Sequence, residues 1–219
     1  MTQQQRFPVL IAGSSHVRRL GQHVSTLPNE NFNITTAPLD AIFFGIGGGK
    51  LENEQHVAAI EYEIQRRHLY CLILHIGGND LDTTDLDDIF CQRLVLKLAL
   101  MTKTFLIRHN IQFVFVCELF PRETPRNVSA GKYNKYKRLF NKLLKGEIKK
   151  MNYVCFWKIR GIQETKEDVF TDSVHLGMEG TTRYYRSIRG ALLQETFRSI
   201  IFLFIFYFPL TMMINLMYE

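Results

Sequence analysis

Four short clusters of residues in this chain have side chains that could do chemistry together. Three of them follow apolar runs of strand character, and the fourth precedes the last helical segment. They are Gly13-Ser14-Ser15-His16, Gly45-Ile46-Gly47-Gly48-Gly49, His75-Ile76-Gly77-Gly78-Asn79-Asp80 and Asp172-Ser173-Val174-His175. In open parallel sheets, ligands bind outside the carboxyl ends of the strands. We therefore expect the four clusters to meet at one edge of a sheet.

Ser15, His175 and Asp172 are the residue types that acyl transfer needs. A serine hydroxyl is a weak nucleophile until a base removes its proton, and His175 is the candidate base. Asp172 lies three residues before it, a spacing that can bring two side chains together within one turn of chain. Asp172 could then fix the imidazole tautomer and stabilise the imidazolium. The pattern predicts nucleophilic catalysis by Ser15.

A tetrahedral intermediate also needs hydrogen-bond donors aimed at its oxyanion. The candidates are the backbone N–H groups of Ser15 and Gly48 and the side-chain amide of Asn79. Glycine lets the backbone approach a substrate with no Cβ in the way. Taken singly, each cluster has a plainer interpretation: Ser15 fits a helix N-cap, and the others fit loops or turns. Their occurrence together, in this order, is far more specific than any one of them.

Alternating strand and helix patterns must position these clusters. Strands are expected at residues 8–12, 41–44, 69–76, 111–119 and 153–157, with an edge strand at 32–36. Helices are expected at residues 53–68, at 130–151, at 177–198, and from the capping-box-like spacing at 84–87 to about Arg108. This alternation predicts an α/β sandwich around a parallel sheet.

The order of the four clusters resembles that of the SGNH (GDSL-type) hydrolase superfamily, over about residues 7–198. The resemblance implies a flavodoxin-like, three-layer α/β/α sandwich with a central parallel sheet and no metal or organic cofactor. It implies Ser15 as the nucleophile of a triad with Asp172 and His175. It also implies an oxyanion hole of Ser15, Gly48 and Asn79, although Gly47 is only one residue from the best match.

Two local features, one at Ser14 and one after residue 118, bear on this resemblance. The family usually carries Asp before the nucleophile, where this chain has Ser14. That change concerns the geometry of the local loop and removes no catalytic role. The stretch Leu119-Phe120-Pro121-Arg122, with Tyr133 and Asn141 downstream, looks like an uncharacterised invertebrate branch of the superfamily.

Composition and charge limit the other classes of function. The chain has 219 residues, of which 46% are hydrophobic and 22% charged, and this globular composition excludes a disordered protein. Its net charge is +6, and twelve Lys or Arg stand against two Glu between residues 121 and 160. Much of that stretch is one face of an amphipathic helix without an aromatic stacking module. We therefore expect a solvated surface and no nucleic-acid partner.

Cysteine spacing and the N-terminus bear on the compartment. Cys71, Cys91, Cys117 and Cys155 are separated by 20, 26 and 38 residues, which gives no zinc-ligand pairing. Three of them, at 71, 117 and 155, lie in apolar runs expected as buried strands, and this favours reduced core thiols. Residues 1–8 are polar and lack the apolar stretch of a signal peptide. The expected location is cytoplasmic.

Residues 199–219 form an apolar tail beyond the expected domain at 1–198. The eighteen residues 200–217 carry no charge, although Pro209 lies in their middle. About eighteen apolar residues make a candidate membrane span, so one interpretation is a tail anchor in an intracellular membrane. The others are a helix docked on the domain and a translated non-coding sequence. Membrane contact is expected only through this tail.

These observations predict a serine esterase that cleaves a small acyl or acetyl ester. The alternative is a catalytically idle SGNH-like binding or interaction module, whose basic surface could serve a retroelement or nucleic-acid partner. The complete set of chemical residues favours the esterase. Ser14 and the basic stretch keep the alternative open.

Overall fold

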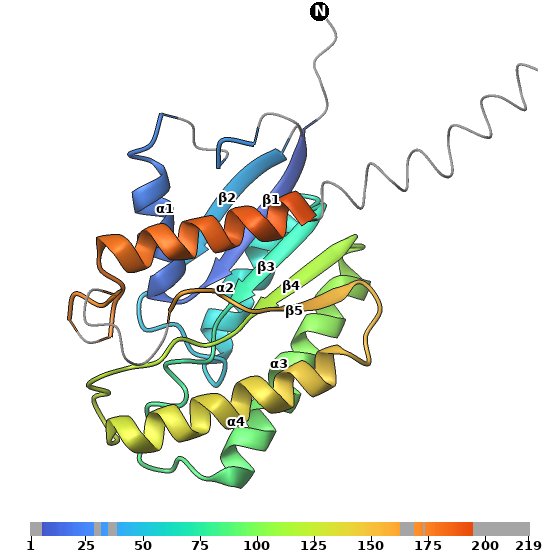
Figure 1. Cartoon of the computed structure of the whole chain (residues 1–219). Helices are drawn as coiled ribbons and strands as arrows, with labels where there is room; N and C mark the ends of the chain where they lie inside the picture. The colour runs from blue at the N-terminus through green and yellow to red at the C-terminus, as the bar shows by residue number, and fades with distance from the viewer. Residues whose placement is uncertain (1–5, 29–31, 35–38, 163–168, 173, 195–219) are drawn as a thin grey trace, which may run out of the picture.

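A parallel five-stranded sheet is the centre of the computed structural model, which describes all residues except 1–5, 29–31, 35–38, 163–168, 173 and 195–219 (Figure 1). In their order across the sheet, the strands are β2 (Leu39–Gly45), β1 (Phe7–Gly13), β3 (Cys71–His75), β4 (Phe113–Cys117) and β5 (Val154–Trp157). All four pairings are parallel. The expected parallel sheet is confirmed.

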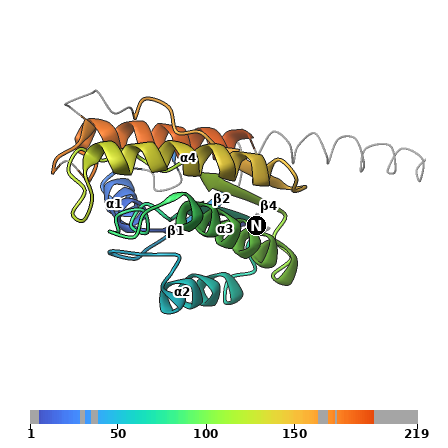
Figure 2. The same ribbon diagram turned by 90° about the horizontal axis from the view of Figure 1, so that it is seen from below.

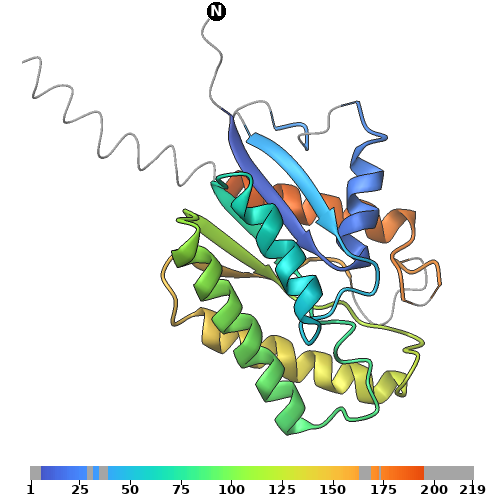
Figure 3. The ribbon, with the colours of Figure 1, turned by 180° about the vertical axis from the view of Figure 1, so that it is seen from behind.

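Helices cover both faces of this sheet. They are α1 (Ser15–Val24), α2 (Glu54–Gln65), α3 (Asp88–Arg108), α4 (Ala130–Ile148) and a C-terminal helix at residues 178–194. One buried hydrophobic cluster contains side chains of α2, α3 and α4, and a second contains side chains of α1 and the C-terminal helix. Figure 2 shows α2 and the C-terminal helix on opposite sides of the sheet, and Figure 3 shows α2 and α3 over the same face.

The residues of β1 explain why the sheet is covered twice. Val9 and Ile11 belong to the cluster with α1, whereas Leu10 and Ala12 belong to the cluster with α2. Successive side chains of a strand point to opposite faces, so a strand that is apolar at every position needs a helix layer on each side. β3 and β4 are likewise buried at every position. The three-layer α/β/α sandwich is therefore confirmed.

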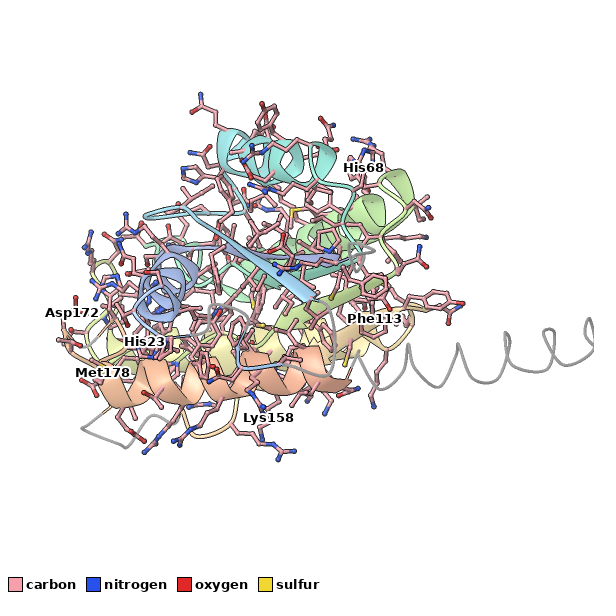
Figure 4. The ribbon with its side chains drawn as sticks, turned by 90° about the horizontal axis from the view of Figure 1, so that it is seen from above. His23, His68, Phe113, Lys158, Asp172 and Met178 are labelled. Atoms are coloured by element: carbon pink, nitrogen blue, oxygen red, sulfur yellow. The ribbon has the colours of Figure 1, made fainter. Side chains whose placement is uncertain are left out.

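The carboxyl ends of β1, β2 and β3 lie together. Gly13 pairs with Gly45 on one side and with His75 on the other. The Ile46 N–H donates to the Gly13 carbonyl at 2.8 Å, and the Ser14 N–H donates to the His75 carbonyl at 3.1 Å. Figure 4 places Asp172 at the end of the molecule opposite to His68 and Phe113, which lie where β3 and β4 begin.

The expected edge strand at 32–36 is wrong for the part that the structure describes. Phe32 and Asn33 form a turn with φ of 57° and 53°, and Ile34 is not in a strand. Such left-handed backbone cannot join a ladder of extended strands. Phe32 is fully buried, and its ring lies 4.9 Å from that of Tyr185. The apolar residues there anchor a loop to the core, and β2 is the edge strand.

Two smaller expectations also need correction. The cap of α3 is Asp87, whose side chain accepts from the Phe90 N–H at 2.7 Å, whereas Thr84 lies in the preceding loop. Cys155 is only partly buried because β5 is an edge strand, unlike Cys71 and Cys117 in the interior. All four cysteines are free thiols.

The apolar tail at 199–219 and the end of the helix expected at 177–198 lie outside the described residues. The helix itself is confirmed from residue 178 to 194. Within the described part of the chain, none of the helices combines the length and the apolar character that crossing a membrane requires.

Candidate active site

A line of hydrogen bonds connects Ser15, His175 and Asp172. Ser15 is the first residue of α1, directly beyond the end of β1, and its Oγ lies 3.3 Å from His175 Nε2. His175 Nδ1 lies 2.7 Å from Asp172 Oδ2. With the Nδ1 proton facing the carboxylate, Nε2 is left as the acceptor for the serine hydroxyl. The structure thus brings together two clusters that lie 160 residues apart.

A short turn holds Asp172 and His175 in this arrangement. Asp172 Oδ1 accepts from the backbone N–H groups of His175 at 2.6 Å and Val174 at 3.3 Å. Although partial burial opposes ionisation, the hydrogen bonds from the His175 ring and from these N–H groups lower the pKa of Asp172 to about 2. An isolated bridge between Phe170 and Leu176 closes the turn. The carboxylate is therefore charged at neutral pH and directed at the imidazole.

The glycine cluster and Asn79 are tied to each other. Asn79 Nδ2 donates to the Gly49 carbonyl at 3.0 Å, and the Gly49 N–H donates to the Ile46 carbonyl at 3.0 Å. Gly48 lies between Ile46 and Gly49 in this turn. Its φ of 68° is a conformation that favours glycine, and an added Cβ there would meet open space. The Ile46 N–H of the glycine turn donates to the carbonyl of Gly13, the last residue of β1, which lies two residues before the candidate nucleophile. The four predicted clusters therefore lie at the carboxyl edge of the sheet.

Asp80 anchors the loop beside this cluster. Its two carboxylate oxygens accept from the backbone N–H groups of Leu51 at 3.0 Å and Glu52 at 2.9 Å. Burial raises the pKa of Asp80 to about 6, although these two hydrogen bonds oppose the shift. Asp80 has a structural part in the site, because it joins the Asn79 loop to the segment that follows the glycines.

Two further histidines lie near Ser15 and His175 without joining the hydrogen bond between them. His75 is buried, its Nδ1 lies 2.8 Å from the Tyr184 hydroxyl, and burial lowers its pKa to about 3. The His16 ring centroid lies 5.9 Å from that of His175, and burial lowers the pKa of His16 as well. Both rings are therefore neutral parts of the wall behind Ser15.

Nothing in the sequence indicated that Arg122 and Asp82 belong to the site. Arg122 contacts Asn79 directly, and Asp82 contacts Arg122. Arg122 Nη2 donates to Asn79 Oδ1 at 2.6 Å, and Arg122 Nη1 donates to Asp82 Oδ2 at 2.9 Å. Both side chains are buried. Arg122 stood out only as part of a stretch of family-like sequence, and the signal that could have identified it is an arginine beside apolar residues directly after a buried strand.

Five of the twelve basic residues between 121 and 160 lie along the exposed side of α4 and at its C-cap. Lys135, Arg138, Lys142, Lys145 and Lys149 are exposed, and their spacing of three and four residues places them along one side of the helix. This agrees with the solvated face expected from the sequence. Among the described residues, no group of three or more His, Cys, Asp or Glu is arranged to hold a metal ion.

No protein-family model matches the chain, and no curated protein matches its sequence. Several solved structures do match. A GDSL-like lipase from Bacteroides thetaiotaomicron has a TM-score of 0.66 at 17% identity and covers 86% of this chain and 88% of its own.

Two esterases match over similar lengths. A carbohydrate esterase family 3 protein from Talaromyces cellulolyticus has a TM-score of 0.62 at 14% identity, with coverage of 86% of this chain and 97% of its own. A catalytic mutant of an acetylxylan esterase from Geobacillus stearothermophilus has a TM-score of 0.59 at 12% identity, with coverage of 86% and 94%. These matches show that the chain has the fold of GDSL-type hydrolases. They give no support to the narrower resemblance to an invertebrate branch.

Proposed function

We propose that this protein is a serine esterase that hydrolyses a small carboxylic ester, such as an acetyl ester. The observation that carries the proposal is the continuous hydrogen-bonded line from Ser15 through His175 to Asp172 at the carboxyl edge of the sheet. A nucleophile, a base and a group that orients the base are the three parts of a serine triad. The chemistry needs no metal or organic cofactor, because the chain itself supplies these groups.

The first half of the reaction forms an acyl-enzyme. His175 Nε2 takes the proton of the Ser15 hydroxyl as Oγ attacks the ester carbonyl carbon, and a tetrahedral intermediate forms. Asp172 stabilises the imidazolium that results. The C–O bond to the alcohol then breaks, and His175 gives its proton to the departing alkoxide. The products are the free alcohol and an acyl group on Ser15.

The second half returns the free enzyme. His175 takes a proton from a water molecule whose oxygen attacks the acyl carbonyl. The second tetrahedral intermediate then breaks its bond to Ser15 Oγ, which recovers its proton from His175. One ester and one water give one acid and one alcohol.

The oxyanion in both halves needs donors that are already in place. We assign this role to the Ser15 N–H, the Gly48 N–H and Asn79 Nδ2. Asn79 Nδ2 carries two N–H bonds, and its contact with the Gly49 carbonyl uses one of them, which leaves the other for the substrate. Loss of a single oxyanion donor typically lowers kcat by about 10² to 10³.

The neighbours with this fold support the reaction class at a coarse level. Their names describe a lipase, a carbohydrate esterase and an acetylxylan esterase. All are hydrolases of carboxylic esters, and one acts on an acetyl ester. We extend this to the present chain because its own Ser15 and His175 lie within hydrogen-bonding distance.

Hydrolysis of p-nitrophenyl acetate tests the proposal. Wild type should release p-nitrophenol catalytically, and Ser15→Ala should lower kcat by about 10⁴-fold or more. Ser25→Ala is the matched control, because Ser25 is an exposed serine at the other end of α1, and it should retain wild-type activity. A folded wild type without esterase activity on acetyl and butyryl esters would instead favour a catalytically idle binding module.

A further inference from the structure

We propose that Arg122, held by Asp82, is a positioning residue that orients and polarises the Asn79 amide as an oxyanion donor. This inference rests on the proposed esterase function and adds two residues to its machinery. Neither residue hydrogen-bonds to Ser15 or His175. Arg122 bonds directly to Asn79, so we expect their effect on the reaction to pass mainly through Asn79. A chain of contacts begins at the loop after β4 and ends at the Asn79 side chain.

The Arg122 guanidinium is buried between two acceptors. Its side chain is 7% exposed, and that of Asp82 is 5% exposed. Nη1 donates to Asp82 Oδ2 at 2.9 Å, and Nη2 donates to Asn79 Oδ1 at 2.6 Å. The guanidinium carbon lies 5.0 Å from the centroid of the Tyr133 ring, at cation–π distance. The cation is therefore fixed on three sides.

The two partners of the Asn79 side chain determine which way the amide faces. Oδ1 accepts from Arg122, and Nδ2 donates to the Gly49 carbonyl. A flipped amide would place its N–H groups against a guanidinium that has only donors, and its oxygen against a carbonyl that has only acceptors. Both contacts would be repulsive. Arg122 and Gly49 together thus keep Nδ2 on the side of the glycine turn, where the oxyanion is expected.

The support beneath Arg122 is built from further hydrogen bonds. Asp82 also accepts from the backbone N–H groups of Arg126 at 3.0 Å and Asn127 at 2.8 Å. The Asn134 side chain binds both the N–H and the carbonyl of Arg122. Hydrogen bonds therefore reach both oxygens of the carboxylate that faces the buried cation. The loop therefore holds the guanidinium rigidly.

A stability role explains this arrangement poorly. Replacement of a buried ion pair by apolar residues is often neutral or stabilising, so such a pair is weak evidence for a contribution to folding. Here Nη1 of Arg122 forms the ion pair with Asp82, and Nη2 donates to Asn79, a residue of the proposed site. A charge-assisted hydrogen bond to an amide oxygen polarises the amide, and this makes its N–H groups stronger donors.

A double-mutant cycle on p-nitrophenyl acetate hydrolysis tests the inference. We expect Arg122→Gln to lower kcat by about 10-fold to 100-fold with little change in KM, which is less than the loss of a whole oxyanion donor. In the Asn79→Ala background, the same substitution should change kcat less than about 2-fold, because the residue through which Arg122 acts is gone. Arg126→Gln is the matched control, since its side chain is exposed and only its backbone contacts Asp82.

Equal effects of Arg122→Gln on kcat in both backgrounds would overturn the inference, provided that activity still depends on Ser15. Activity that is independent of Ser15 would overturn the proposed function and this inference together. Arg122→Lys serves as a second variant because it keeps a cation beside Asp82 if the glutamine variant does not fold. It should lower kcat in the wild-type background and leave the Asn79→Ala background unchanged, and equal losses in both would again contradict the proposal.

Discussion

Asp172 supplies the negative charge beside His175 in the proposed site. Its carboxylate accepts three hydrogen bonds from residues 174 and 175, and its pKa is lowered to about 2. Asp172 therefore stays ionised through the pH range in which a histidine base works. Half of the side chain is exposed, so its value to the protein lies in orienting His175 more than in folding stability.

We predict that Asp172→Asn abolishes most of the activity and preserves the fold. An asparagine can present its own N–H to His175 Nδ1 and so stabilise the wrong tautomer, and kcat should fall by up to about 10⁴-fold. Circular dichroism and thermal unfolding should match wild type. Asp85→Asn, at an exposed site, is the control. An Asp172→Asn enzyme with more than a tenth of wild-type kcat would show that the carboxylate does not act on His175.

The buried Asp80 carboxyl should make the free energy of unfolding depend on pH. Burial raises its pKa to about 6 in the folded protein, above the value of about 3.9 for an unfolded chain. The folded state therefore binds this proton more tightly, so the contribution of Asp80 is fully present below about pH 4 and is lost as the pH rises through 6. Relative to Asp80→Asn, wild type should lose about 2 kcal/mol between pH 4 and 7. Urea unfolding of both proteins measures this, and a constant difference would contradict the assignment.

At the scale of elements, the contact between β1 and β3 determines where Ser15 is presented. An added Cβ on Gly13 would lie 2.1 Å from the His75 carbonyl oxygen, which is the same oxygen that accepts from Ser14. Neither group can move without separating the two strands. Glycine at position 13 is thus required by the close approach of two backbones at the point where the chain turns into α1.

We predict that Gly13→Ala destabilises the protein by at least about 2 kcal/mol through this overpacking, and that it also lowers activity. Gly146→Ala is the matched control, because Gly146 lies inside α4 with open space around its Cβ position. Alanine there should stabilise the helix by about 1 kcal/mol. Urea unfolding distinguishes the two variants, and a Gly13→Ala protein as stable as wild type would show that β1 and β3 are less closely held.

Elements with a continuous apolar pattern could be predicted, and loops anchored by single residues could not. β4 is apolar at every position, and β3 is apolar up to its last residue, His75. Phe32 and Ile34 alternate with polar residues as in a strand. Their side chains are buried, but Phe32 belongs to a turn. The positive φ angles of Phe32 and Asn33 exclude a strand here, and an alternating sequence pattern carries no information about φ. Asp87 in place of Thr84 as a cap is a difference within the usual uncertainty of helix ends.

At the scale of the whole molecule, the order of strands explains which parts of the site could be predicted. β1 lies between β2 and β3, so the loops that follow these strands meet at one edge. Position after a strand was enough to place Ser15, Gly48 and Asn79 there. The Arg122–Asp82 contact spans 40 residues and joins the loops after β3 and β4. No spacing rule predicts which side chains of two such loops touch.

Labelling with a fluorophosphonate probe tests most directly whether Ser15 is a nucleophile activated by His175. Such probes phosphonylate activated serines and release fluoride, so the measurement needs no knowledge of the substrate. The full-length protein is labelled, digested and analysed by mass spectrometry, alongside Ser15→Ala and the control Ser25→Ala. We expect one label per chain on Ser15 in wild type and in Ser25→Ala, and none in Ser15→Ala. Labelling that persists in Ser15→Ala, or a folded wild type that takes no label, would contradict this role for Ser15.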